Sequence, residues 1–171
     1  NETDFTKTIK LIPESKKYES PVIFHCFWLG TLCKKHLISI ISCYYFNVLN
    51  TNNKIILWIE KNQRSKYNER IKQYAEIREF NYEEEIKSLK YENGISYGFK
   101  NRLTEYSDFL RLLLLYNYGG CWFDLDIFFL KSFDPIFSAY HDEICVYQWE
   151  KQNYPNNAIT ISLYKGSDKL K

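Results

Sequence analysis

Short apolar blocks alternate with amphipathic stretches along the first third of the chain. Val22–Trp28 begins with β-branched residues, Lys54–Ile59 is almost wholly apolar, and both are short enough to predict buried strands. Between them, apolar residues recur at helical spacing from Leu32 to Leu49, which predicts a helix. The cluster Asn50–Asn53 predicts a turn between this helix and the second strand.

The same alternation continues into the middle of the chain. Ser65–Tyr74 predicts a helix, Glu76–Tyr82 a short third strand, and Glu83–Leu89 a short acidic helix. Thr104–Tyr118 is a strongly apolar helix, and Gly119 stands where a left-handed C-terminal cap belongs.

The last part of the chain reads mainly as strands. Cys121–Leu130 is an apolar strand interrupted only by two aspartates, and Asp134-Pro135 predicts a turn. Ile144–Trp149 and Ala158–Tyr164 predict two later strands, and a further helix begins at Ser167. Strands that alternate with helices in this way predict an α/β fold with a largely parallel sheet.

We expect one folded unit, because no linker or internal repeat divides the chain. Residues 1–20 lack periodicity and predict an arm or a short helix, whereas 21–171 form a single core. No apolar run reaches the roughly 18 residues of a membrane span, so we expect no transmembrane segment. The chain has no Met, and we therefore expect it to be processed or to be a piece of a longer protein.

Composition narrows the class of protein. With 26% charged and 45% hydrophobic residues the balance is globular, and a net charge of +2 argues against a nucleic-acid partner. No C-x-x-C occurs, so the cysteines predict buried free thiols in a reducing compartment such as the cytoplasm. A secretory lumen or a secreted effector with one or two bridges stays open. The cysteines are Cys26, Cys33, Cys43, Cys121 and Cys145.

The two aspartates in the apolar strand are the first chemical signal. Asp124 and Asp126 are two residues apart, so along an extended chain they share a face. Two carboxylates among apolar neighbours repel each other and are poorly solvated, and a divalent cation relieves both effects. Oxygen ligands suit Mg²⁺ or Mn²⁺. The pair also follows a buried strand, and ligands of open α/β sheets bind at the carboxyl ends of strands.

The preceding helix adds a second pair of charged residues. Asp108 and Arg111 are three apart and share a helical face, within a helix that is apolar nearly all round and should be buried. They form either an intrahelical ion pair or contacts to phosphate and sugar oxygens. Gly119-Gly120 lets the chain reverse and lets the backbone approach a ligand closely. Each signal alone is weak, and their combination is much more specific.

This combination resembles a known family. The order S-D-x-x-R at Ser107–Arg111, then Y-G-G, then Asp124-Leu125-Asp126, is similar to the glycosyltransferase family with a D-x-D sugar-binding region. That family includes yeast-type mannosyl- and galactosyltransferases and, more distantly, the clostridial glucosylating toxins. Pro21–Gly30 is similar to the family's opening P-x-x-I-H-x-x-W-x-G, and Asn156-Asn157-Ala158 followed by Lys165-Gly166 resembles its Asn-Ala strand and K-G turn.

The resemblance implies a GT-A type nucleotide-binding fold, with a mainly parallel mixed sheet flanked by helices. It implies a UDP- or GDP-sugar donor, Mn²⁺ or Mg²⁺, and transfer with retention at the anomeric carbon. Asp108 and Arg111 would contact the donor sugar. Asp126 would bind the metal directly, and Asp124 would face the ribose or reach the metal through water.

Three further residues take a role from the resemblance. Trp28 would lie near the base, where an aromatic face can stack. Trp122 stands where the family often has another aromatic residue, and Asn157 would touch the sugar or the acceptor. The implied activity is that of a hexosyltransferase-like enzyme that acts on an acceptor hydroxyl of a glycan, lipid or protein.

Family members usually continue beyond a position like Lys171, so we expect a fragment or a reduced variant. A non-catalytic module that binds a nucleotide sugar or a protein is the alternative interpretation.

Other chemistries fit the sequence less well. Phosphatases of the haloacid-dehalogenase type carry Gly-Thr after a similar aspartate motif, whereas Ile127-Phe128 follow here. A calcium loop that starts at Asp124 would lack its glycine and its final glutamate. Within a strand, His25 predicts a core histidine with a satisfied hydrogen bond. His36 and His141 have no partners in the sequence and are expected at the surface.

Overall fold

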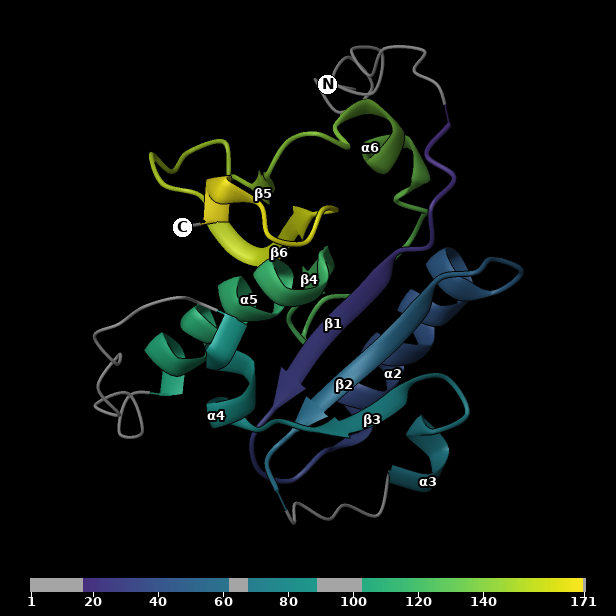
Figure 1. Cartoon of the computed structure of the whole chain (residues 1–171). Coiled ribbons are helices and arrows are strands. Elements are labelled where there is room, and N and C mark those ends of the chain that lie inside the picture. Colours follow the sequence, from purple (N-terminus) through teal and green to yellow (C-terminus); the bar gives the residue numbers. More distant parts are fainter. Residues whose placement is uncertain (1–16, 62–67, 89–102, 171) are drawn as a thin grey trace.

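The structure is a computed structural model that describes residues 17–61, 68–88 and 103–170 (Figure 1). Most of the predicted N-terminal arm, the first residues of the helix expected at Ser65–Tyr74 and residue 171 lie outside the described residues.

A six-stranded mixed sheet forms the centre of the molecule, in the order β3-β2-β1-β4-β6-β5 (Figure 1). β1 pairs in parallel with β2 and β4, and β2 pairs in parallel with β3. β6 runs antiparallel to both β4 and β5. This arrangement confirms the α/β fold with a mainly parallel mixed sheet. The strands are β1 (Ile23–Trp28), β2 (Lys54–Ile59), β3 (Glu76–Glu79), β4 (Gly120–Phe123), β5 (Cys145–Tyr147) and β6 (Asn156–Ser162).

The helices connect these strands largely as predicted. The helix expected over Leu32–Leu49 is present, but its last turn is a π-helix. The long helix before Gly119 begins one residue earlier than predicted. The helices are α2 (Lys34–Cys43), the π-helix η1 (Tyr44–Val48), α3 (Asn68–Ile71), α4 (Tyr82–Glu85), α5 (Leu103–Tyr118) and α6 (Asp134–Ala139), with short 3-10 turns at Ile86–Ser88 and Asp168–Leu170.

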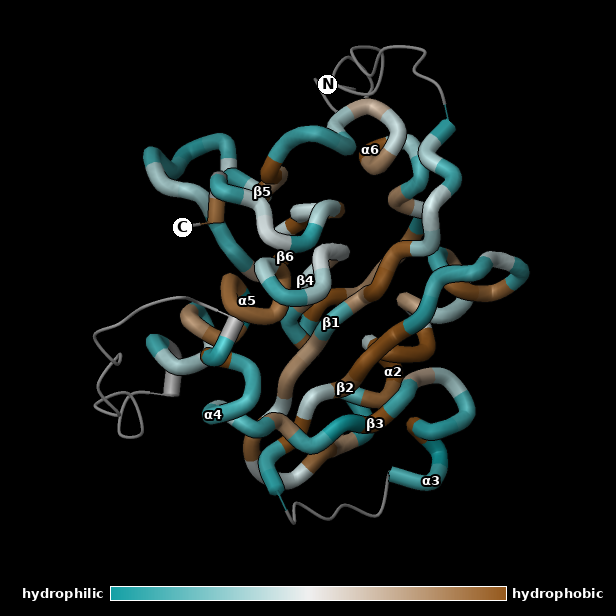
Figure 2. The backbone as a smooth tube through the Cα atoms, in the orientation of Figure 1, coloured by the Kyte–Doolittle hydropathy of each residue, from teal (hydrophilic) through white to brown (hydrophobic). Residues whose placement is uncertain are grey.

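Both faces of the sheet are buried, as expected for parallel strands. Along β1, Phe24 and Cys26 point to one face, which α2 and α6 cover. Trp58 on β2 and Trp122 on β4 point to the other face, which α5 covers. Figure 2 shows the hydrophobic residues concentrated in β1, β2 and the helices beside them. Period-two alternation therefore divides the central strands between two cores.

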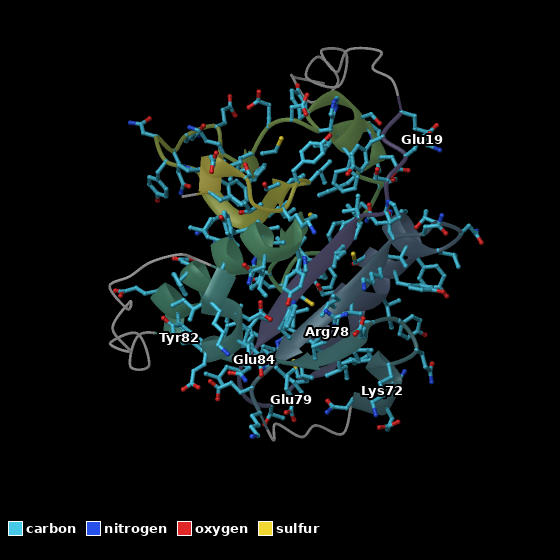
Figure 3. The ribbon with its side chains drawn as sticks, in the orientation of Figure 1. Glu19, Lys72, Arg78, Glu79, Tyr82 and Glu84 are labelled. Carbon is cyan, nitrogen blue, oxygen red and sulfur yellow. The ribbon has the colours of Figure 1, made fainter. Side chains whose placement is uncertain are left out.

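Charged side chains, among them Arg78, Glu79 and Glu84, lie around α4 and around β3, which is one of the two edge strands of the sheet (Figure 3). Lys72 pairs with Glu69 at 2.7 Å, and Arg78 pairs with Glu76. These are solvent-facing ion pairs of small energetic value. Within the described residues, the mixed charges around β3 and α4 therefore form a solvated surface.

The strand predicted over Cys121–Leu130 is wrong beyond Phe123. The chain turns at Asp124, whose carbonyl accepts a hydrogen bond from Ile127 N at 3.0 Å. Residues 127–130 then follow α2, since Ser39 Oγ donates to Ile127 O at 2.6 Å and Ser42 Oγ accepts from Phe129 N at 3.0 Å. These residues alternate between buried and exposed without a β-sheet partner, which explains why their pattern resembles a strand.

Asp134-Pro135 also differs from its predicted turn. These residues begin α6, with the proline in the first turn of the helix. A proline is tolerated there because the first N–H groups of a helix have no partner within it.

Two glycines allow α5 and β4 to join tightly. Gly119 has φ +68° and donates to Leu115 O at 2.8 Å, which confirms the predicted left-handed cap. A Cβ on Gly119 would lie 2.5 Å from Leu163 O, and one on Gly120 would lie 2.1 Å from Ile23 O. The close approach that the two glycines permit in this structure is to neighbouring main chain.

Two of the histidines lie in the core. The prediction for His25 is confirmed: it is fully buried, and its Nε2 lies 3.0 Å from Gly119 O while its Nδ1 accepts from Trp58 Nε1 at 3.1 Å. The surface position predicted for His36 is wrong, because the ring is only 2% exposed and its Nδ1 accepts from Cys33 N at 3.0 Å. His141 is only half-buried, beside Asp142.

All five cysteines are free thiols, but not all are buried. Cys33 is exposed and Cys145 is intermediate, so the prediction of five buried thiols holds only for the other three. Within the described residues, no helix is long and apolar enough to cross a membrane.

Candidate functional site

The candidate site lies where the carboxyl ends of β1 and β4 meet. β1 has β2 on one side and β4 on the other, and the chain leaves β1 toward α2 and β4 toward the turn at Asp124. Ligands of open α/β sheets bind at such a position, where the connections diverge. The structure therefore brings Trp28, the last residue of β1, to the same edge as Asp124 and Asp126.

Arg111 on α5 connects two of the predicted carboxylates. Its Nη1 lies 3.0 Å from Asp108 Oδ1, and its Nη2 lies 3.2 Å from Asp124 Oδ1. Arg111 is 3% exposed, whereas the side chain of Asp108 is 54% exposed. The predicted intrahelical pair is thus present, and it extends to the D-x-D turn. Arginine suits this position because its planar fork offers two donors at once.

Trp122 fixes the other side of Asp124. Its Nε1 donates to Asp124 Oδ1 at 2.8 Å, and Arg111 Cζ lies 5.2 Å from the centre of its ring. Trp122 belongs to the core beneath α5 and is 1% exposed. The structure therefore places this predicted cofactor residue behind Asp124, where it orients the carboxylate.

Residues of β6 make the remaining contacts to Asp108 and Asp124. Asn157 Nδ2 donates to Asp108 Oδ1 at 2.9 Å, and Asp124 N donates to Ala158 O at 2.8 Å. A continuous set of contacts thus joins five of the seven predicted site residues, which come from α5, β4 and β6. They are Asn157, Asp108, Arg111, Asp124 and Trp122.

Asp126 and Trp28 stand apart from this group but at the same edge. Asp126 is exposed, and its negative charge acts on both Asp124 and His36. The ring of Trp28 lies 3.8 Å from that of His36, centre to centre, at 45°, and its Nε1 donates to Thr31 O at 3.2 Å. The indole is therefore held in one orientation.

His36 is a site-edge residue that sequence reasoning missed. The available signal was its spacing from Cys33, because a side chain three residues inside a helix can accept from the N-cap amide. Burial, and then the charge of Lys35, lower the pKa of His36, and Asp126 opposes this shift. A neutral imidazole therefore supports Trp28.

The electrostatics of Asp124 combine opposing effects. Burial raises the pKa of its carboxyl group, and the charge of Asp126 adds to this rise. The hydrogen bond from Trp122 and the positive charge of Arg111 lower the pKa again. A cation placed between the two aspartates would favour their charged forms.

The donor set fits an oxygen-ligated divalent cation. Both hydrogen bonds to the Asp124 carboxylate use Oδ1, which leaves Oδ2 without a hydrogen bond among the described residues. In the same part of the chain no group of three or more His, Cys, Asp or Glu side chains could hold a metal. Two carboxylates completed by water and phosphate oxygens suit Mg²⁺ or Mn²⁺, whereas a structural zinc site needs four protein ligands.

The fold and this site together define a domain of the glycosyltransferase type. The sequence model described as "Glycosyltransferase sugar-binding region containing DXD motif" matches residues 39–142, which is more than half of the chain. The chain therefore belongs to this glycosyltransferase family, and the predicted resemblance is confirmed.

Comparison with known structures supports the GT-A type fold. The chain is similar to a solved structure described as "PaToxG Glycosyltransferase", with a TM-score of 0.62 and 21% sequence identity. The similarity covers 97% of this chain and 63% of that chain, so this chain spans less than two thirds of its length. No curated protein matches the chain by sequence.

Proposed function

We propose that this domain transfers a sugar from a nucleoside-diphosphate sugar to an acceptor hydroxyl, as a hexosyltransferase of class EC 2.4. The observation that carries this proposal is the hydrogen-bonded group of Asp108, Arg111, Asp124 and Asn157 at the carboxyl edge of the sheet. These residues come from three different parts of the fold, whereas a purely structural ion pair would need only Asp108 and Arg111 on α5.

Asp124 and Asp126 would hold the cation. When bound, Mn²⁺ or Mg²⁺ supplies Lewis-acid neutralisation of the charge that develops on the diphosphate. Trp122 and Arg111 both contact Asp124 Oδ1, and this fixes the rotation of the carboxylate. The free Oδ2 and the exposed Asp126 are then the available oxygen ligands.

The donor would lie across the ends of β1 and β4. Trp28 would stack on the base of a UDP- or GDP-sugar, supported from behind by His36. Asp108 would accept from the sugar hydroxyls, because it is the exposed member of the group. Arg111 is buried, and we assign it the task of holding Asp108 and Asp124 in register. Asn157 would contact the sugar or the acceptor beside Asp108.

Transfer with retention is part of the proposal. The bond between the anomeric carbon and the diphosphate oxygen breaks, and its electron pair goes to the diphosphate. The acceptor hydroxyl attacks from the same face, and its proton passes to the departing diphosphate oxygen. None of the site carboxylates is an obvious nucleophile toward the anomeric carbon, since Asp124 and Asp126 would be engaged by the cation and Asp108 is engaged by Arg111 and Asn157. A trapped glycosyl-enzyme adduct would contradict this step.

The decisive first test is a thermal-shift panel of UDP- and GDP-sugars, each with and without Mn²⁺. A ligand that binds only the folded state raises the free energy of unfolding by mass action, by about 2.7 kcal/mol at a ligand concentration of 100 Kd, and the unfolding midpoint rises with it. We expect one donor to raise the midpoint, and only when Mn²⁺ is present. The absence of any shift would exclude a competent donor site in this chain.

Two variants separate the site from the rest of the surface. Asp124→Asn and Asp126→Asn should abolish the Mn²⁺-dependent shift, whereas Asp142→Asn, on an exposed turn, should retain it. Hydrolysis of the donor with the same dependence on Asp126 would then establish turnover.

The alternative is a non-catalytic module that binds the nucleotide sugar or a protein. It would show the donor-dependent shift without turnover, or keep its biological activity in Asp124→Asn. An acceptor hydroxyl on a glycan, lipid or protein is likewise part of the proposal. So is a cytoplasmic location, which the free thiols favour.

A further inference from the structure

A basic and apolar surface lies on α2 and on the segment that runs beside it. Three hydrogen bonds hold residues 127–133 parallel to α2 and η1: Ser39 to Ile127, Ser42 to Phe129, and Asn47 to Phe133. Large apolar side chains face solvent from both segments. We call this surface the α2 face, and it consists of Ile38, Tyr45, Phe46, Leu49, Phe128 and Leu130.

The geometry explains why these side chains are together. Ile38, Tyr45 and Leu49 recur at spacings of seven and four, so they follow one side of the helix. Phe128 and Leu130 alternate with the half-buried Ile127 and the buried Phe129, so they point away from the core. Leu130 is 79% exposed, the largest exposure among the large hydrophobic residues of the described chain. Large exposed apolar side chains that gather on two adjacent segments indicate an interaction site.

The charged residues within α2 and within residues 127–133 are all lysines. No Asp or Glu occurs from Ser20 to Ile59, nor within 127–133. Lys34 and Lys35 stand at the start of α2, and Lys131 follows Leu130; all three are exposed. None of these lysines forms an ion pair with the described residues. The nearest acids along the segment are Asp126, in the candidate site, and Asp134, half-buried at the start of α6.

We propose that the α2 face binds the surface of an anionic lipid bilayer. Exposed apolar side chains can enter the boundary between headgroups and acyl chains, and lysines beside them are attracted to negative lipid. A symmetric contact with a second protein copy would bring the lysines of the two α2 faces together, and neither α2 nor residues 127–133 supply an acidic partner for them. The charge of this surface therefore favours a bilayer. This inference does not depend on donor binding.

The test is co-sedimentation of the whole chain with vesicles. Vesicles of phosphatidylcholine alone are compared with vesicles that also contain phosphatidylserine, at low and at high salt. We expect binding to the anionic vesicles, weakened by salt because the lysine contribution is screened. Equal binding to both kinds of vesicle, or none to either, would overturn the proposal.

Matched variants assign the binding to the α2 face. Phe128→Ser with Leu130→Ser should weaken vesicle binding by about tenfold or more, since the apolar side chains supply insertion. Lys131→Glu should weaken binding to the anionic vesicles alone. Tyr154→Ser and Lys151→Glu, exposed residues of the loop between β5 and β6, are the controls and should bind like the wild type.

A second measurement keeps the result interpretable. The unfolding midpoints of Phe128→Ser and Leu130→Ser should match that of the wild type, because both side chains are exposed. Sedimentation velocity without lipid identifies the competing occupant. A concentration-dependent dimer that these two variants abolish, together with unchanged vesicle binding, would assign the α2 face to a second copy and overturn the proposal.

Discussion

Arg111 and Asp124 lie thirteen residues apart in sequence and form an ion pair across the end of the sheet, with 3.2 Å between Nη2 and Oδ1. The same guanidinium holds Asp108 on its own helix. Because Arg111 is almost completely buried, its position is set by the core, and the carboxylates take theirs from it. The alignment of α5 against β4 is therefore transmitted directly to the acidic turn.

Arg111→Lys should separate this positioning from simple charge. Lysine is a point charge and cannot bridge two carboxylates with a planar fork, so we expect about a tenfold loss of donor affinity in the presence of Mn²⁺. The free energy of unfolding should fall by about 1–2 kcal/mol. Titration calorimetry and denaturant unfolding measure the two effects. Arg78→Lys is the control, because Arg78 lies over the ring of Trp58 and pairs with Glu76, away from the site. Unchanged donor affinity in Arg111→Lys would refute the positioning role.

Trp122→Phe should alter metal binding through Asp124. The indole hydrogen bond lowers the pKa of the Asp124 carboxyl, so its loss should raise that pKa further. Because the metal needs the deprotonated carboxylate, the pH midpoint of Mn²⁺ binding should move upward. Mn²⁺ affinity near that midpoint should fall by about tenfold, the equivalent of one hydrogen bond of about 1.5 kcal/mol. Trp58→Phe removes a core indole that contacts His25 instead, and its midpoint should not move.

Gly119→Ala should destabilise the protein more than Gly166→Ala. Both glycines have nearly the same positive φ, +68° and +71°, so the conformational cost of about 1 kcal/mol is shared. Only at Gly119 does the new Cβ meet main chain, whereas at Gly166 nothing lies within 4 Å. We expect an additional loss of about 1–3 kcal/mol at Gly119, measured by urea unfolding. Equal losses would show that backbone conformation alone limits both positions.

His25 should make stability depend on pH. Burial is the main cause that lowers its pKa from 6.5 to about 4, and the surrounding contacts require one tautomer. Nδ1 accepts from Trp58, so protonation there would bring two donors together. The unfolded state therefore binds the proton more readily than the folded state between these two pKa values. The contribution of neutral His25 to the free energy of unfolding is fully present above pH 6.5. It is lost as the pH falls toward 4, and the loss amounts to about 3 kcal/mol.

The measurement is the free energy of unfolding of the wild type and of His25→Gln at pH 7 and pH 4.5. Glutamine does not titrate, so the variant should be less stable at pH 7 and should lose less stability on acidification. A wild type and a variant with the same pH dependence would assign the acid sensitivity to other groups.

Local patterns in the sequence were sufficient for β1, β2 and α5. β2 occupies the predicted range, because an apolar run bounded by turn residues is a signal contained in neighbouring positions. The apolar pattern of 127–130 misled, because alternating burial arises equally from a segment that packs along a helix. Whether such a segment pairs with a strand depends on Ser39 and Ser42, almost ninety residues earlier.

The candidate site divides in the same way. The Asp108–Arg111 pair and the pair of aspartates could be found from their spacing, but the sequence placed the aspartates in a strand and missed the turn that they occupy. The contact between Asn157 and Asp108 joins residues 49 apart, and no periodicity encodes it. His36 was misplaced because its burial follows from the ring of Trp28 above it, which is a tertiary contact.

The antiparallel return of β6 has a consequence for biosynthesis. Translation produces both aspartates of the turn before it produces Asn157 and Ala158, which hold Asp108 and the Asp124 main chain. Domains fold as the ribosome extends them, N-terminal parts first. A nascent chain that stalls between the two segments therefore carries the acidic turn without the strand that secures it, and its product lacks the assembled site.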